Sequence, residues 1–338
     1  MTIDLTGGMD PATDEVTSET PTTEAYREGT SMWIWDDAGQ VGLPRVGVEC
    51  VGATWETARM VTLNLALPDG RVLSAFANER PHPVTDADGH SRILGAGPLR
   101  FVCVEPFDHW RLEFDGVAAV TTVEDLIAGN ARRGGEDGAE STPLRIDIDG
   151  RMAAPPWVQG SQDPDGQFIV GEERFEQLFT ASGVVSVDGD TINLTGGGLR
   201  IHRKGGNRSD YNDFFGHCWQ SARFPSGRAF GFIHYTPRPD GSVKYHEGWL
   251  MDDGEVESAR VVDTPWLGHM QPRGEDVGFT LRTRRGEIRI EGETSLSSFA
   301  PERPIGDGVT FPTLQQAIAK YRWDGEEAYG MIERSSRL

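Results

Sequence analysis

Residues 196–224 read GGGLRIHRKGGNRSDYNDFFGHCWQSARF and gather side chains that could do chemistry, within a chain otherwise typical of short β-strands and turns. Side chains two apart on a strand share a face. The triplet HCW therefore places His217 and Trp219 on one face and Cys218 on the other. A β-barrel does not need this mixture to fold, so the stretch is a candidate active-site wall.

A second segment, YHEGW, repeats the spacing and places Tyr245, Glu247 and Trp249 on one face, after an Arg-Pro-Asp-Gly turn that favours a hairpin. A carboxyl group among aromatic rings has a raised pKa and can deliver a proton at neutral pH. Indole and phenol faces can stabilise a developing carbocation, and a histidine can deprotonate water or a carbon. We predict Glu247, His217 and Tyr245 as catalytic residues. The alternative is that both tryptophans and His217 are core residues and Glu247 lies at the rim.

The polar run SDYND and its neighbours add further candidates. Asp210 and Asp213 could supply another acid, or they could belong to a polar loop held by its own hydrogen bonds. Arg203 and Arg208 could orient a carbonyl or carboxylate, or pair with those aspartates. We add Asp210 and Asp213 to the predicted catalytic residues.

Two alternating tryptophans near the start, Trp33 and Trp35, face one side of a predicted strand and could cap an apolar cavity between domains. Such tryptophans are also common in cores. The predicted substrate-binding residues are aromatic, histidine or arginine side chains: Trp219, Trp249, Tyr211, Arg203, Arg208, His234, Trp33 and Trp35.

Alternating apolar and polar residues around Pro-Asp-Gly and Asp-Gly turns recur along the chain, as in RMVTLNLALPDGRVLSAFANE and in AIAKYRWDGEEAYGMIERS. Strands spaced about ten residues apart predict antiparallel barrels or sandwiches. Helical periodicity is confined to short segments, TVEDLIAGNARR and PTLQQAIAK, and the second could instead run into the last hairpin. The predicted fold class is all-β, with two lipocalin-like antiparallel domains and few short helices.

Composition divides the chain into three parts. Residues 1–30 are rich in Thr, Glu, Asp, Gly and Pro, which predicts a disordered acidic leader. The polar, Gly- and Pro-rich stretch from 130 to 165 predicts a connection between two β-domains. We therefore predict an N-terminal domain over 31–155 and a C-terminal domain over 156–338.

The net charge of −21 disfavours nucleic acid and anionic membrane surfaces as partners. No apolar run approaches the roughly 20 residues of a membrane helix, and no secretory signal or phosphate-binding loop appears. Dispersed histidines and three distant cysteines suggest neither a metal site nor a disulfide framework. We expect a cytoplasmic protein without cofactor or metal that binds a hydrophobic small molecule; homo-oligomerisation is left open.

Several spaced motifs occur in an order that resembles a known family: LPDGRVLSAF, GPLRFVCVEPFDHWRLEFDG, VDGDTINLTGGGLRIHRKGGNR, SGRAFGF and EEAYGMIERS. The chain resembles the two-domain lipocalin-like proteins that include the carotenoid 1,2-hydratases, also called hydroxyneurosporene synthases. The resemblance covers most of the chain after about residue 30. It implies a pair of calycin-like barrels with a cavity for terpenoids, polyketides or steroids, and no cofactor.

In the carotenoid hydratases a His-x-Trp pair followed by Tyr-x-Asp is thought to protonate the alkene. The matching residues here are His217, Trp219 and Tyr245, with Glu247 in place of the aspartate. The chain departs from many relatives by reading KGGN where an Asp-His-Ser-Trp run would lie, which puts hydration itself in doubt.

Three functions follow from these patterns. The first is a lyase or isomerase of hydratase or dehydratase type, working by acid–base chemistry on an apolar substrate in a cavity lined by both domains. The second is a cyclase or pericyclase that folds a polyene substrate. The third is a non-catalytic protein that binds a hydrophobic ligand.

Overall fold

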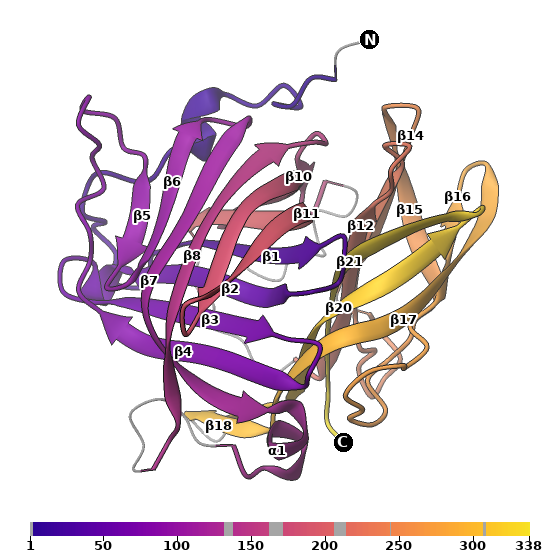
Figure 1. Ribbon diagram of the computed structural model, residues 1–338. Helices are drawn as coiled ribbons and strands as arrows, with labels where there is room; N and C mark the ends of the chain where they lie inside the picture. The colour runs from indigo at the N-terminus through magenta and orange to yellow at the C-terminus, as the bar shows by residue number, and fades with distance from the viewer. Residues whose placement is uncertain (1–2, 132–137, 162–171, 206–213, 244, 307–308) are drawn as a thin grey trace.

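The chain folds into two antiparallel β-barrels that lie side by side (Figure 1). The structure is a computed structural model that describes residues 3–131, 138–161, 172–205, 214–243, 245–306 and 309–338. Within these ranges no helix has both the length and the apolar character needed to cross a membrane. The predicted all-β class with two lipocalin-like barrels is confirmed.

The first barrel closes because β4 pairs with β7 at the ends of a continuous ladder. Its order is β4-β3-β2-β1-β11-β10-β8-β7, and β5, β6 and β9 extend the sheet. The bounds are β1 (Arg27–Asp36), β2 (Gly42–Val51), β3 (Arg59–Ala66), β4 (Arg71–Glu79), β5 (Ile93–Ala96), β6 (Leu99–Glu105), β7 (His109–Thr122), β8 (Ser141–Met152), β9 (Trp157–Val158), β10 (Glu172–Val187) and β11 (Asp190–Gly205).

The second barrel follows the chain order, and β21 returns to pair with β12. A separate hairpin, β18–β19, precedes the last two strands. The bounds are β12 (Gly216–Arg223), β13 (Ala229–Tyr235), β14 (His246–Asp252), β15 (Glu255–Asp263), β16 (Phe279–Thr283), β17 (Gly286–Ala300), β18 (Arg303–Gly306), β19 (Val309–Phe311), β20 (Thr313–Trp323) and β21 (Glu326–Ser336).

Turn chemistry explains the hairpins that the sequence predicted. Asp324 and Gly325 join β20 to β21 with φ of 48° and 82°, the left-handed conformations that a tight hairpin turn requires. The Pro-Asp-Gly turn at Gly70 joins β3 to β4, and the one at Gly241 joins β13 to β14. These hairpin predictions are confirmed.

Helices are few, as expected. The predicted helix near residue 123 is α1 (Val123–Ala128), which is capped by the Thr122 hydroxyl and ends at Gly129 in the left-handed conformation. Two 3₁₀ turns, η1 (Pro11–Asp14) and η2 (Gly52–Thr54), complete the set among the described residues. The segment PTLQQAIAK is strand β20 rather than a helix, because its pairing with β17 and β21 overrides the helical propensity.

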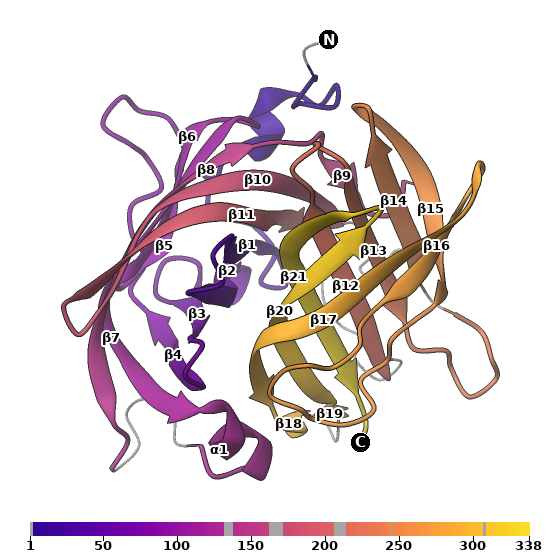
Figure 2. The ribbon, with the colours of Figure 1, turned by 45° about the vertical axis from the view of Figure 1, so that its right-hand side comes forward.

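Strands at the boundary between the barrels are buried on both faces. On β12, Cys218 and Ala222 belong to the core of the second barrel, whereas Trp219 belongs to a core shared with the first barrel. Trp33 on β1 lies in the same shared core. Figure 2 shows β1, β2 and β11 facing β12, β20 and β21 across this boundary.

The barrels approach closely at Gly42 of β2. A Cβ atom there would lie 2.6 Å from Cγ1 of Ile318 on β20, so only glycine allows this contact without a shift. Nearby, Asn64 of β3 donates a hydrogen bond of 2.9 Å to the side chain of Gln316 on β20.

The predicted domain boundary near residue 155 does not match the way in which the strands divide between the two barrels. The long hairpin of β10 and β11, residues 172–205, belongs to the first barrel, where β11 pairs with β1. Without this hairpin nothing would link β1 to β8, and the first barrel would stay open. The chain passes to the second barrel between Gly205 and Gly216.

The prediction that residues 1–30 are a disordered leader is also wrong for the described part. β1 begins at Arg27, and Asp14 is fully buried in the first barrel. One Asp14 oxygen lies 2.7 Å from Nη1 of Arg200, and the other accepts hydrogen bonds from the backbone N–H of Phe107 and the indole of Trp110. Burial alone would raise the pKa of Asp14, but Arg200, His202 and the Phe107 N–H outweigh burial and lower it. Composition alone did not reveal this buried anchor.

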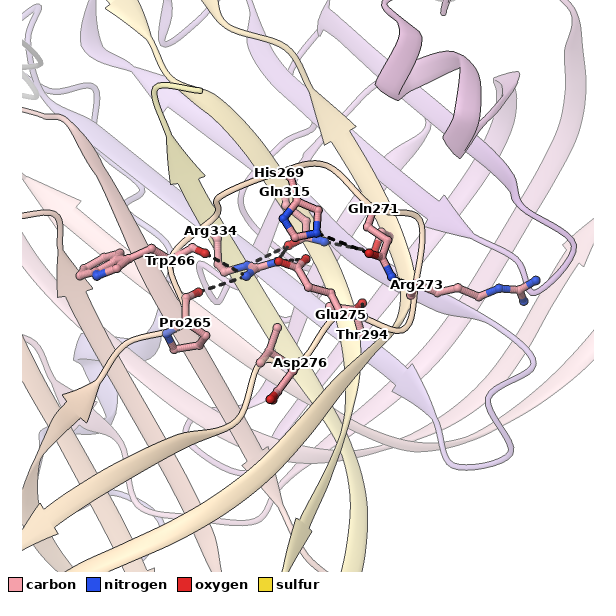
Figure 3. Close-up of polar contacts among 12 residues, drawn as sticks. Pro265, Trp266, His269, Gln271, Arg273, Glu275, Asp276, Thr294, Gln315 and Arg334 are labelled. Atoms are coloured by element: carbon pink, nitrogen blue, oxygen red, sulfur yellow. Dashed lines mark hydrogen bonds and ion pairs between the residues drawn. The ribbon is translucent and has the colours of Figure 1, made fainter.

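A long connection between β15 and β16 is fixed by the buried guanidinium of Arg334, which lies on β21 (Figure 3). Arg334 donates to Gln315 Oε1, to the carbonyl oxygens of Pro265 and Trp266, and to the carboxylate of Glu275. These contacts hold the connection against strands β20 and β21.

We predict that Asp14→Asn destabilises the protein by about 3 kcal/mol or more, because an amide cannot satisfy all the donors and leaves the Arg200 charge without its carboxylate. Urea unfolding measures this loss, and limited proteolysis within residues 3–26 should become faster. The control is Glu19→Gln, an exposed change in the same segment with the same change in charge. Equal stability of the two variants would contradict the anchoring role of Asp14.

Candidate functional site

A cavity of about 80 Å³ lies between the barrels and is lined from both sides. Its described lining residues are aromatic, basic or apolar, with one carboxylate: Trp33, Arg45, Arg174, Ile201, Arg203, Phe214, His217, Trp219, Ile233, Tyr235, Phe311 and Glu333. Ligand pockets commonly span about 300–1,000 Å³. The cavity therefore holds a small group or one end of a larger ligand.

Part of the wall comes from outside the barrel strands. Phe214 precedes β12, Phe311 ends β19, and their rings stack with centroids 5.5 Å apart. Phe214 also contacts the rings of His217 and Tyr235. A ligand larger than the cavity would have to displace this aromatic side.

His217 and Glu333 form an imidazole–carboxylate pair in the cavity wall. Strands β12 and β21 pair with His217 opposite Ser335 and Trp219 opposite Glu333. The His217 Nε2 atom lies 3.3 Å from Glu333 Oε1, and its Nδ1 atom lies 2.7 Å from Ser335 Oγ. Ser335 is fully buried and does not line the cavity, so it orients the imidazole rather than reaching a ligand.

Glu333 is held as a carboxylate. Burial alone would raise its pKa, but the hydrogen bond from His217 and the charge of Arg45 outweigh burial and lower it to about 2. Its second oxygen accepts a 2.6 Å hydrogen bond from Gln316, which in turn accepts from Asn64 of the first barrel. The orientation of Glu333 thus depends on both barrels.

Glu176, on β10 of the first barrel, is a second buried carboxyl group close to the cavity. It accepts hydrogen bonds of 3.1 Å from the Trp219 indole and from Arg174. Burial raises its pKa to about 7, the charge of Arg174 and both hydrogen bonds oppose the rise, and Glu247 adds to it. Glu176 is therefore poised to exchange a proton near neutral pH.

Tyr245 and Glu247 share the face predicted from the sequence. The Tyr245 hydroxyl donates a 2.7 Å hydrogen bond to Glu247, which also accepts from the backbone N–H of Gly160 at 3.2 Å. Burial and the neighbouring carboxylates raise the pKa of Tyr245, so its phenol stays protonated. Both side chains are buried beside the cavity rather than on its described wall.

The structure brings four predicted site residues together on the cavity wall: His217, Trp219, Trp33 and Arg203. The shared faces predicted from alternation are those seen, but they point away from the lumen of the second barrel and toward the first. Arg208, Asp210, Tyr211 and Asp213 lie outside the described residues.

Three predicted substrate-binding residues lie elsewhere. Trp35 packs in the shared core, and Trp249 stacks on Trp157. His234 stacks on His246 with ring centroids 3.8 Å apart, and its Nδ1 atom lies 2.7 Å from the Thr264 hydroxyl. Burial and the nearby His246 lower the pKa of His234 to about 3, so this ring is neutral.

Sequence reasoning missed Glu333, Glu176, Arg174 and Arg45. Glu333 and Ser335 share a face of β21, but Arg334 on the other face is also buried, so polarity alone could not identify the site face. In EERFEQLF, Arg174, Glu176 and Leu178 share one face of a strand. Two charged residues followed by an apolar one on the same face could have indicated a polar face that becomes buried at one end.

Across the described ranges, no group of three or more His, Cys, Asp or Glu side chains is arranged to hold a metal ion.

Sequence comparison places most of the chain in one family. A family described as a domain of unknown function, DUF7064, matches residues 11–337. The chain belongs to the DUF7064 family. No curated protein matches this DUF7064 chain in sequence.

Solved structures share its fold at low sequence identity. A putative AttH protein from Nitrosomonas europaea has a TM-score of 0.58 and 14% identity, with 93% of each chain covered. CghA, solved with Sch210972, has a TM-score of 0.58 and 12% identity over 93% of this chain and 89% of its own. Kievitone hydratase from Nectria haematococca has a TM-score of 0.52 and 10% identity over 98% of this chain and 95% of its own. The DUF7064 chain therefore has the two-barrel architecture of these proteins.

The raised pKa of Glu176 makes stability depend on pH. Glu176 keeps its proton up to about pH 7 when folded but only to about pH 4.5 when unfolded, so its contribution to stability falls as the pH rises through this window. Between pH 5 and pH 8 the wild type should lose up to about 3 kcal/mol more unfolding free energy than Glu176→Gln. Urea unfolding at both pH values measures the difference.

Glu302 is exposed, so Glu302→Gln serves as the matched control, and its unfolding free energy should depend on pH as that of the wild type does. Parallel pH dependence of the wild type and Glu176→Gln would mean that Glu176 does not titrate in this window.

Proposed function

We propose that this protein is a lyase or isomerase of hydratase or dehydratase type, acting by acid–base chemistry on a hydrophobic terpenoid-, steroid- or polyketide-like substrate held between the barrels. The proposal uses the protein's own side chains for proton transfer. It rests chiefly on one observation, the His217–Glu333 pair in the wall of an aromatic cavity.

The chemistry follows from how that pair is held. Ser335 fixes one imidazole nitrogen and Glu333 faces the other, so a proton between Nε2 and Oε1 lies at the cavity surface. The imidazole and the carboxylate together provide a route by which a proton passes to a substrate or from it. Trp33, Trp219 and Phe214 exclude water and hold an apolar skeleton beside the pair.

Similar proteins support the reaction class. Kievitone hydratase, which shares the two-barrel fold, is a hydratase by name. The resemblance to carotenoid 1,2-hydratases rests on the motifs of the sequence, with His217 and Trp219 at the matching His-x-Trp positions. In the proposal Glu333 rather than Glu247 is the carboxylate that works with His217.

The test is incubation of the purified protein with a pooled library of terpenoids, steroids and polyketides, followed by chromatography and mass spectrometry. We expect a compound that changes by the mass of one water, or an isomer with a new retention time. His217→Ala and Glu333→Gln should each slow this conversion roughly 100-fold or more. The exposed variant Glu327→Gln should retain wild-type activity.

Glu247→Gln separates the two candidate acid–base pairs. Loss of activity in this variant with full activity in Glu333→Gln would assign the chemistry to Tyr245 and Glu247 instead. Binding of library compounds without conversion would leave a non-catalytic binding protein. Ring formation at constant mass, insensitive to both carboxylate variants, would favour a cyclase, for which the aromatic walls are suited.

A further inference from the structure

The described wall of the cavity is rich in positive charge. Three guanidinium groups, those of Arg45, Arg174 and Arg203, line it together with a single carboxylate, Glu333. The chain as a whole carries a net charge of −21. Arg203 is buried, and Arg45 and Arg174 are partly buried. Three arginines around one cavity in such an acidic protein require a local reason, because desolvating a charge is costly.

Two of these arginines lie directly opposite each other. Arg174 on β10 and Arg203 on β11 are register partners, and their side chains leave the sheet on the same face. Like charges at such positions repel and destabilise the pair of strands. Arg174 pairs with Glu176 and Arg203 with Glu49, but Glu176 has a raised pKa and carries little negative charge below about pH 7.

Two hydrogen-bond donors on the wall are unsatisfied within the part of the chain that the structure describes. The Arg174 Nε and Trp33 Nε1 atoms are buried, and neither has an acceptor among the residues that the structure describes. Both side chains line the cavity. A buried donor without an acceptor costs free energy, which a ligand oxygen in the cavity would recover.

The aromatic residues supply the complementary half of a binding site. Trp33 and Trp219 pack edge to face with ring centroids 4.6 Å apart, and Arg174 lies over the Trp219 ring at 5.1 Å. Arg45 lies over the Trp33 ring at 5.6 Å. Apolar walls that end at guanidinium groups suit a ligand with an apolar body and an anionic end.

We propose that the ligand of this cavity is an apolar carboxylic acid whose carboxylate is bound by Arg45, Arg174 and Arg203. The inference rests on the proposed function, because it names the substrate class of the same cavity. It also narrows the chemistry: guanidinium groups favour negative charge developing on a ligand oxygen and repel a carbocation.

The experiment compares three probes with one naphthalene body and different charge: 2-naphthoate, 2-naphthalenemethanol and 2-naphthylmethylammonium. Isothermal titration calorimetry with the full-length protein gives each dissociation constant. We expect 2-naphthoate to bind at least roughly 10-fold more tightly than the alcohol, as charge-assisted hydrogen bonds imply, and the ammonium compound to bind most weakly. This comparison uses the wild-type protein alone, so its result does not depend on whether a variant folds.

Arg45→Gln should weaken 2-naphthoate binding roughly 10-fold and leave the alcohol unchanged, while Arg45→Lys should restore part of the loss. The matched control is Arg282→Gln on β16, an exposed arginine outside the cavity that makes the same change in net charge. Equal loss in both variants would assign the effect to long-range charge and overturn the proposal.

Other outcomes also overturn it: tightest binding of the ammonium compound or the alcohol, or no binding of 2-naphthoate at millimolar concentration. Failure of the proposed function gives a different result. Selective 2-naphthoate binding without turnover of any library compound would keep the ligand class and remove catalysis, whereas turnover restricted to uncharged compounds would keep catalysis and remove the ligand class.

Discussion

The two barrels meet at a shared buried core, and polar groups bond across it, as where the indole of Trp219 on the second barrel donates a hydrogen bond to the carboxyl of Glu176 on the first. Strands on both sides of this boundary are buried on both faces, one face in a barrel core and the other in the shared core. Polar groups placed there cannot turn to water and must find partners across the boundary. The candidate site is therefore a property of the assembled pair of barrels.

This constraint explains why two carboxyl groups near the cavity differ so much in acidity. Glu333 faces an imidazole, an amide and the charge of Arg45, and its pKa falls to about 2. Burial raises the pKa of Glu176 more than its hydrogen bonds and the charge of Arg174 lower it. The charge of Glu247 adds to the rise, and the pKa reaches about 7. Environments that push the pKa values of neighbouring acids apart are typical of sites where one group stays charged and the other exchanges a proton.

The sequence predicted local structure well and long-range structure poorly. Turn residues located the hairpins, and alternation placed His217 with Trp219, and Tyr245 with Glu247, on shared faces. It could not say which face points into a barrel, because Phe232 on one face and Ile233 on the other are both apolar and buried. The partner of His217 comes from the last strand, and the partner of Arg200 from the acidic leader. Such pairings over long distances in sequence leave no local pattern.

The closing of each barrel by distant strands has a consequence for synthesis of the protein. β1 must wait for β11, since Glu28 pairs with Lys204, and β12 must wait for β21. At roughly 5–20 residues per second, a ribosome needs on the order of 10 s or more between making β1 and releasing β11. During that interval the edge of β1 that pairs with β11 in the folded protein has no partner, and such edges are surfaces on which strands of other chains assemble. Shielding of that edge until β11 emerges would therefore favour folding of the nascent chain over aggregation.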